Sequence, residues 1–311
     1  MPVDILSILP EARFTLPSFA KINLTLRVLG RREDGYHELD TVFQTISLHD
    51  ELTFDARDDA RLELNCDAHG IPSDETNLVH RAAVALRERY GVRRGARVEL
   101  HKKIPAGGGL GGGSSNAAVA LMGLARLWEI ETERRTLAEI GAALGADVPF
   151  FLIGGTALGM GRGTDIHPLA DVPQKYLLLI TPDINVSTVE AYKSLNAPAL
   201  TKPLSPANLT VSRVQAEISG SLHAVLENDF ERVIYRLYPE IERARTSLVA
   251  AGASRALLSG SGASVFALFD SLDEREGARG RLQVEPGWQV FVCTTLARAA
   301  YAAAFDADKF L

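Results

Sequence analysis

The chain has 311 residues, of which 46% are hydrophobic and 23% charged, as expected for one large or two ordinary globular domains. Its net charge of −6 and lack of any lysine or arginine block argue against nucleic acid or an anionic membrane as the main partner. Cys66 and Cys293 lie far apart, which argues against a disulfide framework. With no stretch of transmembrane length and no basic n-region, we expect a cytoplasmic protein.

The first half of the chain predicts β-strands that lead into a glycine-rich loop. Residues 19–28 alternate strictly, which predicts a strand with one apolar and one polar face. The apolar face would hold Ala20, Ile22, Leu24, Leu26 and Val28, and the polar face Lys21, Asn23, Thr25 and Arg27. A turn at 34–35 and strands at 40–47, 50–54, 60–65 and 98–103 follow, with helices at 77–90 (before Gly91) and 132–144 (Gly145 as its C′ residue).

The glycine-rich loop holds six glycines within seven positions, 107–113, directly before an apolar run at 117–122. Ordering glycine is entropically costly, so this density indicates a backbone that approaches a ligand closely. Ser114, Ser115 or Asn116 would cap the helix that follows. Because free N–H groups and the positive end of a helix dipole attract anions, the loop predicts a phosphorylated ligand.

Three kinds of glycine loop compete here. A Walker A loop is excluded because no Gly-Lys-Ser/Thr closes the segment. The pattern Gly107-x-Gly109-x-x-Gly112 matches the dinucleotide fingerprint, with an acidic residue near the expected distance at Glu129 or Glu131. The preceding strand opposes it, since residues 97–102 alternate in polarity whereas a dinucleotide-domain strand is buried on both faces. A flexible linker is opposed by the helix that follows at once.

A second series of predicted strands and helices begins near residues 171–173. We expect strands at 176–181, 256–258, 264–269 and 288–294, helices starting at 187–190 and spanning 213–226, 239–251 and 272–282, and a loop at 197–208. This order is that of a split β-α-β arrangement. Two α+β domains, residues 1–170 and 171–311, would then meet at a ligand-binding cleft.

Four groups of polar residues have an ordinary structural explanation when each is taken singly. They are Lys21 and Asn23 on a solvated strand face, Asp147 as the cap of a turn, Tyr36 and His37 on a hairpin surface, and residues 259–262 in a flexible turn. Their combined order along the chain changes this interpretation. The segments are SFAKINL at 18–24, DGYHEL at 34–39, PxGxGLGGGSSNAA at 105–118, GADVPFF at 145–151 and SGSGA at 259–263.

This set closely resembles the GHMP family of small-molecule kinases, over nearly the whole chain from about Phe14. The segments at 34–37 and 145–149 resemble the branch that phosphorylates a methylerythritol linked to cytidine diphosphate, in the non-mevalonate route to isoprenoids. The resemblance implies a two-domain α+β fold. The N-terminal domain would be like domain 2 of ribosomal protein S5 and the C-terminal domain a ferredoxin-like split β-α-β unit, with the active site in the cleft between them.

The resemblance also implies the catalytic and cofactor-binding residues. Those that would bind the triphosphate of ATP are Pro105, Ala106, Gly107, Gly108, Gly109, Leu110, Gly111, Gly112, Gly113, Ser114 and Ser115. Asp147 would accept the proton of the substrate hydroxyl or orient that hydroxyl, and Lys21 would keep Asp147 ionised and stabilise the transferring group. Mg²⁺ would accompany ATP, with Ser115 as the one protein ligand that the family pattern suggests.

The substrate side is implied in the same way. Asn23, Tyr36 and His37 would bind the cytidyl end, with the Tyr36 ring stacking on the base and His37 offering a polar edge. Tyr192 is a candidate for the second wall of a base sandwich, and a half-buried helix aromatic is the equally good alternative. Residues 259–262 would pack against the phosphate loop.

Three other functions remain as alternatives. A homoserine or mevalonate kinase of the same family is opposed by residues 34–37, since those substrates have no base to stack on an aromatic ring. The others are a nicotinamide or flavin oxidoreductase and a nucleic-acid binder, which the net charge opposes. We expect a small-molecule substrate, no nucleic-acid or membrane partner, and a monomer or weak homodimer. The extension before Phe14 has no role that the sequence indicates.

Overall fold

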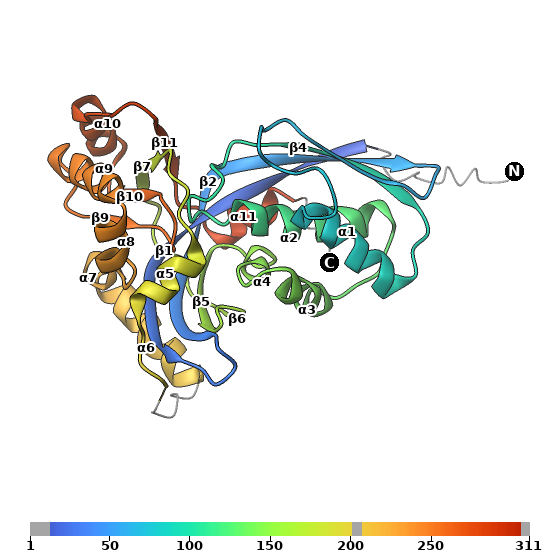
Figure 1. Cartoon of the computed structure of the whole chain (residues 1–311), viewed down its shortest axis with the longest axis horizontal. Coiled ribbons are helices and arrows are strands. Elements are labelled where there is room, and N and C mark those ends of the chain that lie inside the picture. Colours follow the sequence, from blue (N-terminus) through green and yellow to red (C-terminus); the bar gives the residue numbers. More distant parts are fainter. Residues whose placement is uncertain (1–12, 201–206, 306–311) are drawn as a thin grey trace, which may run out of the picture.

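The computed structural model describes residues 13–200 and 207–305, which form two α+β halves side by side (Figure 1). Residues 1–12 of the extension before Phe14, and residues 201–206 of the predicted loop at 197–208, fall outside the described residues. Within the described residues, no helix combines the length and the apolar character that crossing a bilayer requires.

The N-terminal half is built on a seven-stranded sheet with the order β3-β4-β2-β1-β8, in which β5 pairs with both β2 and β6. The strands are β1 (Arg13–Arg31), β2 (His37–Arg57), β3 (Leu62–Cys66), β4 (Gly95–His101), β5 (Thr156–Gly161), β6 (Asp165–Pro168) and β8 (Glu227–Asn228). The two strands predicted at 40–47 and 50–54 are one continuous strand, β2. The residues between the two predicted strands stay within β2, because the pairing of β1 with β2 shifts its register between Phe19 and Ala20 and then continues.

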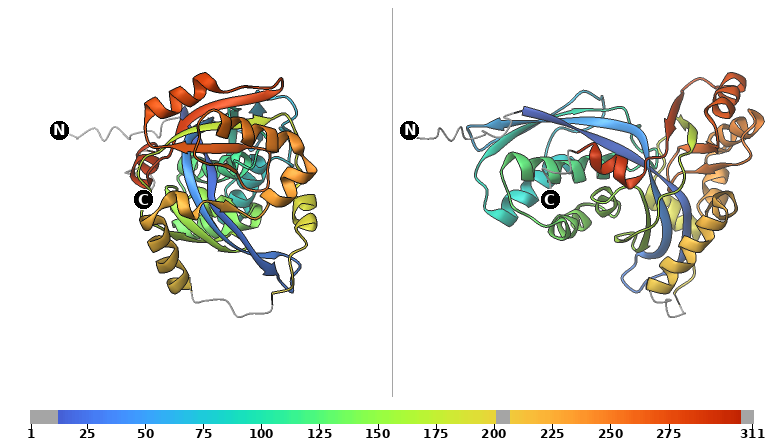
Figure 2. Two further views of the ribbon diagram at one scale, coloured as in Figure 1. Left: turned by 90° about the vertical axis from the view of Figure 1, so that its left-hand side faces the viewer. Right: turned by 180° about the vertical axis from the view of Figure 1, so that it is seen from behind.

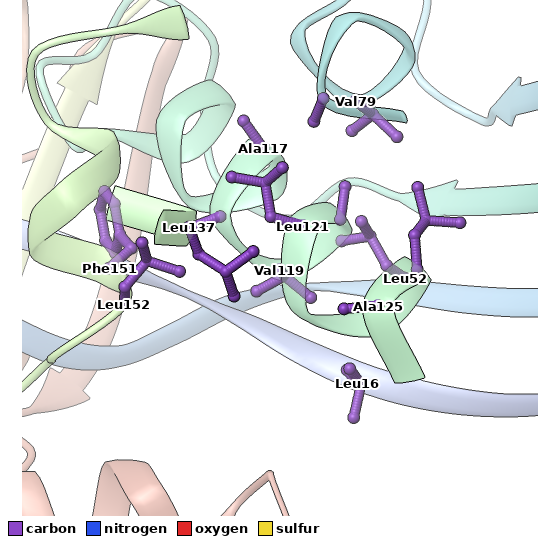
Figure 3. Packing of buried hydrophobic residues seen from close by; sticks show 14 of the residues in the cluster. Leu16, Leu52, Val79, Ala117, Val119, Leu121, Ala125, Leu137, Phe151 and Leu152 are labelled. Atoms are coloured by element: carbon purple, nitrogen blue, oxygen red, sulfur yellow. The ribbon is translucent and has the colours of Figure 1, made fainter. Parts of the chain in front are cut away.

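Helices cover one face of this sheet and enclose an apolar core (Figures 1 and 3). They are α1 (Leu78–Tyr90), α2 (Gly112–Leu127), α3 (Arg134–Leu144), the short α4 (Val148–Phe151) and α11 (Arg298–Ala303). Asn77 caps α1 by accepting from the backbone N–H of Val79, and Gly91 ends that helix in a left-handed conformation. Helix α3 ends at Leu144 and Gly145 follows it, as predicted, with an extended backbone at φ −175°.

The C-terminal half is an antiparallel sheet with the order β11-β7-β10-β9, which confirms the four strands predicted there. The strands are β7 (Tyr176–Pro182), β9 (Ala256–Leu258), β10 (Val265–Phe269) and β11 (Trp288–Thr294). The helices are α5 (Thr188–Leu195), α6 (Ala207–Gly220), α7 (Leu222–Val225), α8 (Glu231–Leu237), α9 (Pro239–Ala250) and α10 (Leu272–Arg281). The fold is therefore α+β in both halves, as predicted.

The predicted helix at 213–226 has the wrong bounds. Helix α6 begins at Ala207, although its first residues are polar enough to resemble a loop, because Val214 and Ile218 bury its inner side. Extended backbone at Ser221 separates it from α7. Helix α8 and strands β5, β6 and β8 are further elements that the sequence analysis did not predict.

The two halves are joined by apolar packing and by the last described helix. Ile22 and Leu24 of β1 share one buried cluster with Leu177 and Leu179 of β7. Helix α11 returns to lie beside α2 of the N-terminal half (Figures 1 and 2), where Tyr301 is buried against Phe19 with ring centroids 5.6 Å apart. A domain boundary at 170/171 remains a prediction. Helix α11, which comes after that boundary in the sequence, packs on the N-terminal half.

Candidate active site

A buried lysine and a half-buried aspartate face each other where β1 meets the start of α4. The Nζ of Lys21 lies 3.3 Å from Oδ2 of Asp147, and the Lys21 side chain is 4% exposed. The family resemblance implies that these two side chains lie together, and they do. The alternative of a solvated strand face for Lys21 and Asn23 is wrong, because both are almost fully buried.

Lys21 also holds two neutral oxygen partners. Its Nζ donates to Oδ1 of Asn23 at 2.7 Å and to the carbonyl oxygen of Gly109, in the glycine loop, at 2.9 Å. A buried ammonium needs such partners because desolvation otherwise makes the charge costly. The Lys21 ammonium therefore contacts the first strand, the glycine loop and Asp147 at the same time.

The face pattern predicted for β1 is correct only as far as Leu24. There a β-bulge leaves Leu24 without a partner, since Asn23 pairs with Phe43 and Thr25 pairs with Val42. An extra residue moves all later side chains to the opposite face of the sheet. Leu26 consequently lines the same cavity as Lys21 and Asn23, instead of lying with the earlier apolar residues.

The glycine loop is shaped by positions that other residues could not occupy. Gly107, Gly109 and Gly111 have φ of +70°, +75° and +70°. A Cβ on Gly109 would lie 2.0 Å from the carbonyl oxygen of Ser259. Close approach of another backbone, in addition to the left-handed conformation, therefore requires glycine here.

The helix after the loop begins earlier than predicted. Its N-cap is Gly111, which makes no side-chain capping bond, and Ser114, Ser115 and Asn116 all lie inside α2. The predicted capping serine or asparagine is therefore wrong. The backbone N–H groups at the N-terminus of α2 have no side-chain cap, so an anion can bind them.

Ser115 and Asn116 point into the protein and away from the loop's open side. The Oγ of Ser115, a fully buried residue, accepts from Oγ of Ser18 at 2.8 Å. The amide of Asn116 donates to Ser18 at 2.8 Å and to the buried carboxylate of Asp50 at 2.9 Å. Asp50 also accepts from Lys102, so this network anchors the base of the loop.

The turn between β9 and β10 packs directly on the glycine loop. The Oγ of Ser259 donates to the carbonyl oxygen of Gly109 at 3.1 Å, and the N–H of Ser264 donates to that of Gly108 at 3.0 Å. A Cβ on Gly262 would lie 2.2 Å from the N of Gly109. The predicted contact between residues 259–262 and the loop is present, and it joins the two halves of the chain at the site.

A cavity of about 800 Å³ opens beside this point and is lined by both halves of the chain. From the residues predicted for the site, the lining includes Lys21, Asn23, Tyr36, His37, Gly109, Gly111, Ser114, Asp147 and Tyr192. Ser115 is not among the lining residues. The structure therefore brings together the predicted transfer pair, part of the glycine loop and the predicted aromatic residues in one cavity.

The aromatic residues come from two distant elements. His37 at the start of β2 contacts Tyr192 of α5 with ring centroids 4.8 Å apart, and Tyr192 packs edge-on against the buried Phe230 at 4.8 Å. The guanidinium carbon of Arg162 lies 3.6 Å from the centroid of the exposed Tyr36 ring. These planar groups form a wall on which a flat ring can stack.

Burial shifts the pKa values of two of these rings, His37 and Tyr192. Desolvation, and then the nearby charge of Arg31, lower the pKa of His37 below its ordinary value. Desolvation, and then the negative charge of Asp147, raise the pKa of Tyr192 well above its ordinary range. His37 is therefore a neutral ring near pH 7 and Tyr192 a neutral phenol, both suited to an uncharged base.

The cavity is positively charged although the whole chain is acidic. Lys21, Arg31, Arg162 and Lys193 line it, against Asp147 as the one carboxylate among its described lining residues. Such a local concentration of positive charge favours a polyanionic ligand. Arg31, Arg162 and Lys193 were not predicted, because isolated basic residues in three separate segments of the chain leave no local pattern.

The donor groups in the cavity fit Mg²⁺ only as part of a shared site. Among the described residues there is no cluster of three or more His, Cys, Asp or Glu side chains that could hold a metal. The cavity offers the carboxylate of Asp147 and the residue Ser114, whose hydroxyl is an oxygen donor. Mg²⁺ commonly takes one or two carboxylates and completes its shell with phosphates and water, so these groups fit that mode.

A second cavity, of about 370 Å³, adjoins the beginning of the glycine loop. Pro105 and Ala106 line it, together with Lys102 from the segment before the loop and Ile184 from the segment after β7. The beginning of the loop thus lines one cavity and its later residues line the other.

Comparisons with known proteins agree with this geometry. The family model described as GHMP kinases N terminal domain matches residues 77–155, and the model described as GHMP kinases C terminal matches residues 215–285. A 4-diphosphocytidyl-2-C-methyl-D-erythritol kinase of Moorella thermoacetica is 42% identical over 272 residues, covering 86% of this chain and 94% of that protein.

Solved structures show the same likeness. A crystal structure of a 4-(cytidine 5'-diphospho)-2C-methyl-D-erythritol kinase matches with a TM-score of 0.71 and 34% identity, covering 91% of this chain and 99% of that one. A homoserine kinase from Cytophaga hutchinsonii matches with a TM-score of 0.67 at 21% identity, covering 95% of this chain and 98% of that one. At that lower identity the likeness shows the fold alone.

Proposed function

The chain belongs to the GHMP kinases, and we propose that it transfers the γ-phosphoryl group of ATP to the 2-hydroxyl of 4-diphosphocytidyl-2-C-methyl-D-erythritol. This reaction would serve the non-mevalonate route to isopentenyl diphosphate. We further propose that the protein works in the cytoplasm as a monomer or weak homodimer.

One observation carries the proposal: a single cavity holds the Lys21–Asp147 pair, an aromatic wall at His37 and Tyr192, and several cationic side chains. The proposed substrate has the matching parts, namely a hydroxyl to be phosphorylated, a flat cytosine ring and a diphosphate. A volume of about 800 Å³ is large enough for a ligand with all three parts.

The roles of the transfer pair follow from their positions. Asp147, with its side chain 30% exposed to the cavity, would accept the proton of the substrate hydroxyl or orient that hydroxyl for attack. Lys21 would place its remaining N–H against the phosphoryl group, where negative charge is redistributed during transfer. Both groups are held in place before any substrate arrives, which lowers the entropic cost of reaching the transition state.

The glycine loop, which lines both cavities, would hold the ATP phosphates. Its backbone N–H groups and the N-terminus of α2 would meet the negative charge, and the second cavity, beside Pro105 and Ala106, would take the adenosine part. Asp147 and Ser114 would hold the Mg²⁺ that accompanies ATP, and the ion would supply positive charge against the phosphates. We propose Ser114 in preference to Ser115, because the Ser115 hydroxyl is buried against Ser18.

The alternatives fit the structure less well. A homoserine or mevalonate kinase would leave the ring wall of His37 and Tyr192 without a partner on the substrate. In a dinucleotide-binding unit the strand before the glycine loop pairs in parallel with the strand after the loop helix. Here β4, before the loop, and β5, after it, do not pair with each other, and each pairs antiparallel with β2. The dehydrogenase alternative is therefore wrong.

The test is ADP release by the purified protein with Mg-ATP, in the presence and absence of 4-diphosphocytidyl-2-C-methyl-D-erythritol. Phosphorus NMR of the product would show whether the new phosphate is on the 2-hydroxyl. Homoserine, mevalonate and methylerythritol lacking the cytidyl group are the matched acceptors. ADP release with the full substrate alone is expected, whereas equal release with mevalonate or homoserine would refute the substrate assignment and keep the kinase class.

A further inference from the structure

The ammonium group of Lys21 has its hydrogen bonds almost fully assigned. An ammonium carries three N–H donors. Two of them go to Oδ1 of Asn23 and to the carbonyl oxygen of Gly109, at 2.7 and 2.9 Å. One remains for the Asp147 carboxylate or a phosphoryl oxygen, so the direction of this last N–H depends on where the first two acceptors lie.

The Asn23 side chain can help Lys21 in only one of its two amide orientations. With Oδ1 toward Lys21, it accepts from the ammonium; with the amide reversed, its NH₂ would face three more N–H donors and repel them. An amide side chain shows its orientation only through its neighbours' hydrogen bonds. The other end of the amide therefore decides whether Lys21 is held.

Thr41 on β2 is the neighbour that sets this orientation. Its Oγ1 donates to the carbonyl oxygen of Thr25 at 2.7 Å, and a carbonyl oxygen can only accept. Because a hydroxyl has a single proton, Oγ1 of Thr41 can then only accept from Asn23, whose Nδ2 lies 2.8 Å away. This leaves Oδ1 of Asn23 facing Lys21.

The β-bulge explains why Thr41 can reach both groups. Thr25 follows the unpaired Leu24, and its own Oγ1 accepts from the backbone N–H of Val42 at 3.0 Å. Thr41 is 1% exposed, so water does not compete for its hydroxyl. The Thr25 carbonyl, the Thr41 hydroxyl, the Asn23 amide and the Lys21 ammonium thus form one chain with a single consistent direction of donation.

We propose that Thr41 is a positioning residue for phosphoryl transfer, acting through Asn23 to fix the Nζ of Lys21. The inference rests on the proposed function for its kinetic test. It assigns Asn23 a second task besides substrate contact, since both ends of its amide are engaged within the protein. Removing the Thr41 hydroxyl would free the amide to reverse while the glycine loop and the aromatic wall stay in place.

The test compares Thr41→Val, which keeps the shape and loses the hydroxyl, with Thr41→Ser, which keeps the hydroxyl. Thr53→Val is the matched control, because Thr53 lies on the same strand and its hydroxyl pairs with that of the exposed Thr15 at 2.8 Å. We expect kcat to fall about fivefold in Thr41→Val, as loss of one hydrogen bond of about 1 kcal/mol predicts. Both KM values should stay within about twofold.

Thr41→Ser and Thr53→Val should keep the wild-type kcat. The proposal is overturned if Thr41→Val retains that kcat, if its loss lies wholly in KM, or if Thr41→Ser loses as much. Should Thr41→Val fail to fold by circular dichroism, Thr41→Cys replaces it, because a thiol is a much weaker donor. A Cys variant with the turnover of the Ser variant would then overturn the proposal.

Failure of the proposed function gives a different result. Wild-type protein would then transfer no phosphate to the cytidyl substrate, and the test moves to crystal structures of Thr41→Val and wild type. Separation of Lys21 Nζ from the Asn23 amide in the variant supports the positioning role. An unchanged contact at 2.7 Å overturns it.

Discussion

Replacing Gly109 by alanine tests how the glycine loop is held. The residue has φ +75°, and a Cβ would lie 2.0 Å from the carbonyl oxygen of Ser259 and 3.0 Å from the N of Gly262. Both neighbours are backbone atoms, so no side chain can rotate away. The oxygen of Ser259 must withdraw to an ordinary contact distance of 3.4 Å or more, which pushes the β9–β10 turn off the loop.

Two costs combine in this variant. The left-handed conformation costs a residue with a Cβ about 1–2 kcal/mol, and forcing an extra carbon into a packed contact costs about 1–3 kcal/mol more. The free energy of unfolding should therefore fall by about 2–5 kcal/mol. Since Lys21 and Ser259 both donate to the carbonyl oxygen of Gly109, movement here should also raise KM for ATP.

Gly107→Ala is the matched control from the same loop. Its φ of +70° carries the same conformational cost, but the nearest atom to a new Cβ is Oδ1 of Asn185 at 3.5 Å, an ordinary contact. Urea unfolding followed by circular dichroism should show a loss of about 1–2 kcal/mol for Gly107→Ala and a clearly larger loss for Gly109→Ala. Equal losses in the two variants would refute the argument that the Ser259 contact requires glycine.

Three further predictions use the same protein. Asp147→Asn should lower kcat by roughly 10²–10⁴ in the ADP-release assay, as loss of a positioned acid or base does, and near-normal turnover would remove Asp147 from the mechanism. Asp50→Asn should lower the free energy of unfolding by about 3–5 kcal/mol, because it leaves the buried Lys102 ammonium without its carboxylate; Glu51→Gln, in an exposed pair, should change it by less than about 1 kcal/mol in the same urea titration. The pKa of His37 lies below its ordinary value of about 6.5, so the folded state binds fewer protons there than the unfolded chain; the stability from neutral His37 is present above about pH 6.5 and is lost as the pH falls through the folded pKa. In His37→Gln the free energy of unfolding should fall less as the pH is lowered than it does in the wild type. An identical dependence on pH in the two proteins would contradict this prediction.

Much of the fold follows from local patterns in the sequence. Alternation identified the strand at 19–28, an apolar run identified the strand at 176–181, and Asn77 with Gly91 marked the ends of α1. These signals are local because a strand's two faces, a cap and a left-handed glycine each involve only a few neighbouring residues. Segment order, in turn, identified the family and the residues Lys21 and Asp147.

The positions of helix starts were less well determined. Ser114, Ser115 and Asn116 are good caps by composition, yet the structure starts α2 at Gly112 and turns two of them inward to Ser18 and Asp50. Their partners lie on β1 and β2, far away in sequence. Whether such a side chain caps a helix or joins a buried hydrogen-bond network depends on which partners the tertiary structure places near it.

By itself the sequence determined most of the elements, the glycine loop and the pair of residues, Lys21 and Asp147, that we propose for phosphoryl transfer. Only the tertiary structure decided which side chains face the cavity: the bulge at Leu24 turns Leu26 toward it, and the distant strand β2 brings Thr41 to Asn23. Arg162 likewise reaches Tyr36 only in the folded chain. Strand register and contacts between elements depend on the packing of the whole molecule, and no short stretch of residues encodes them.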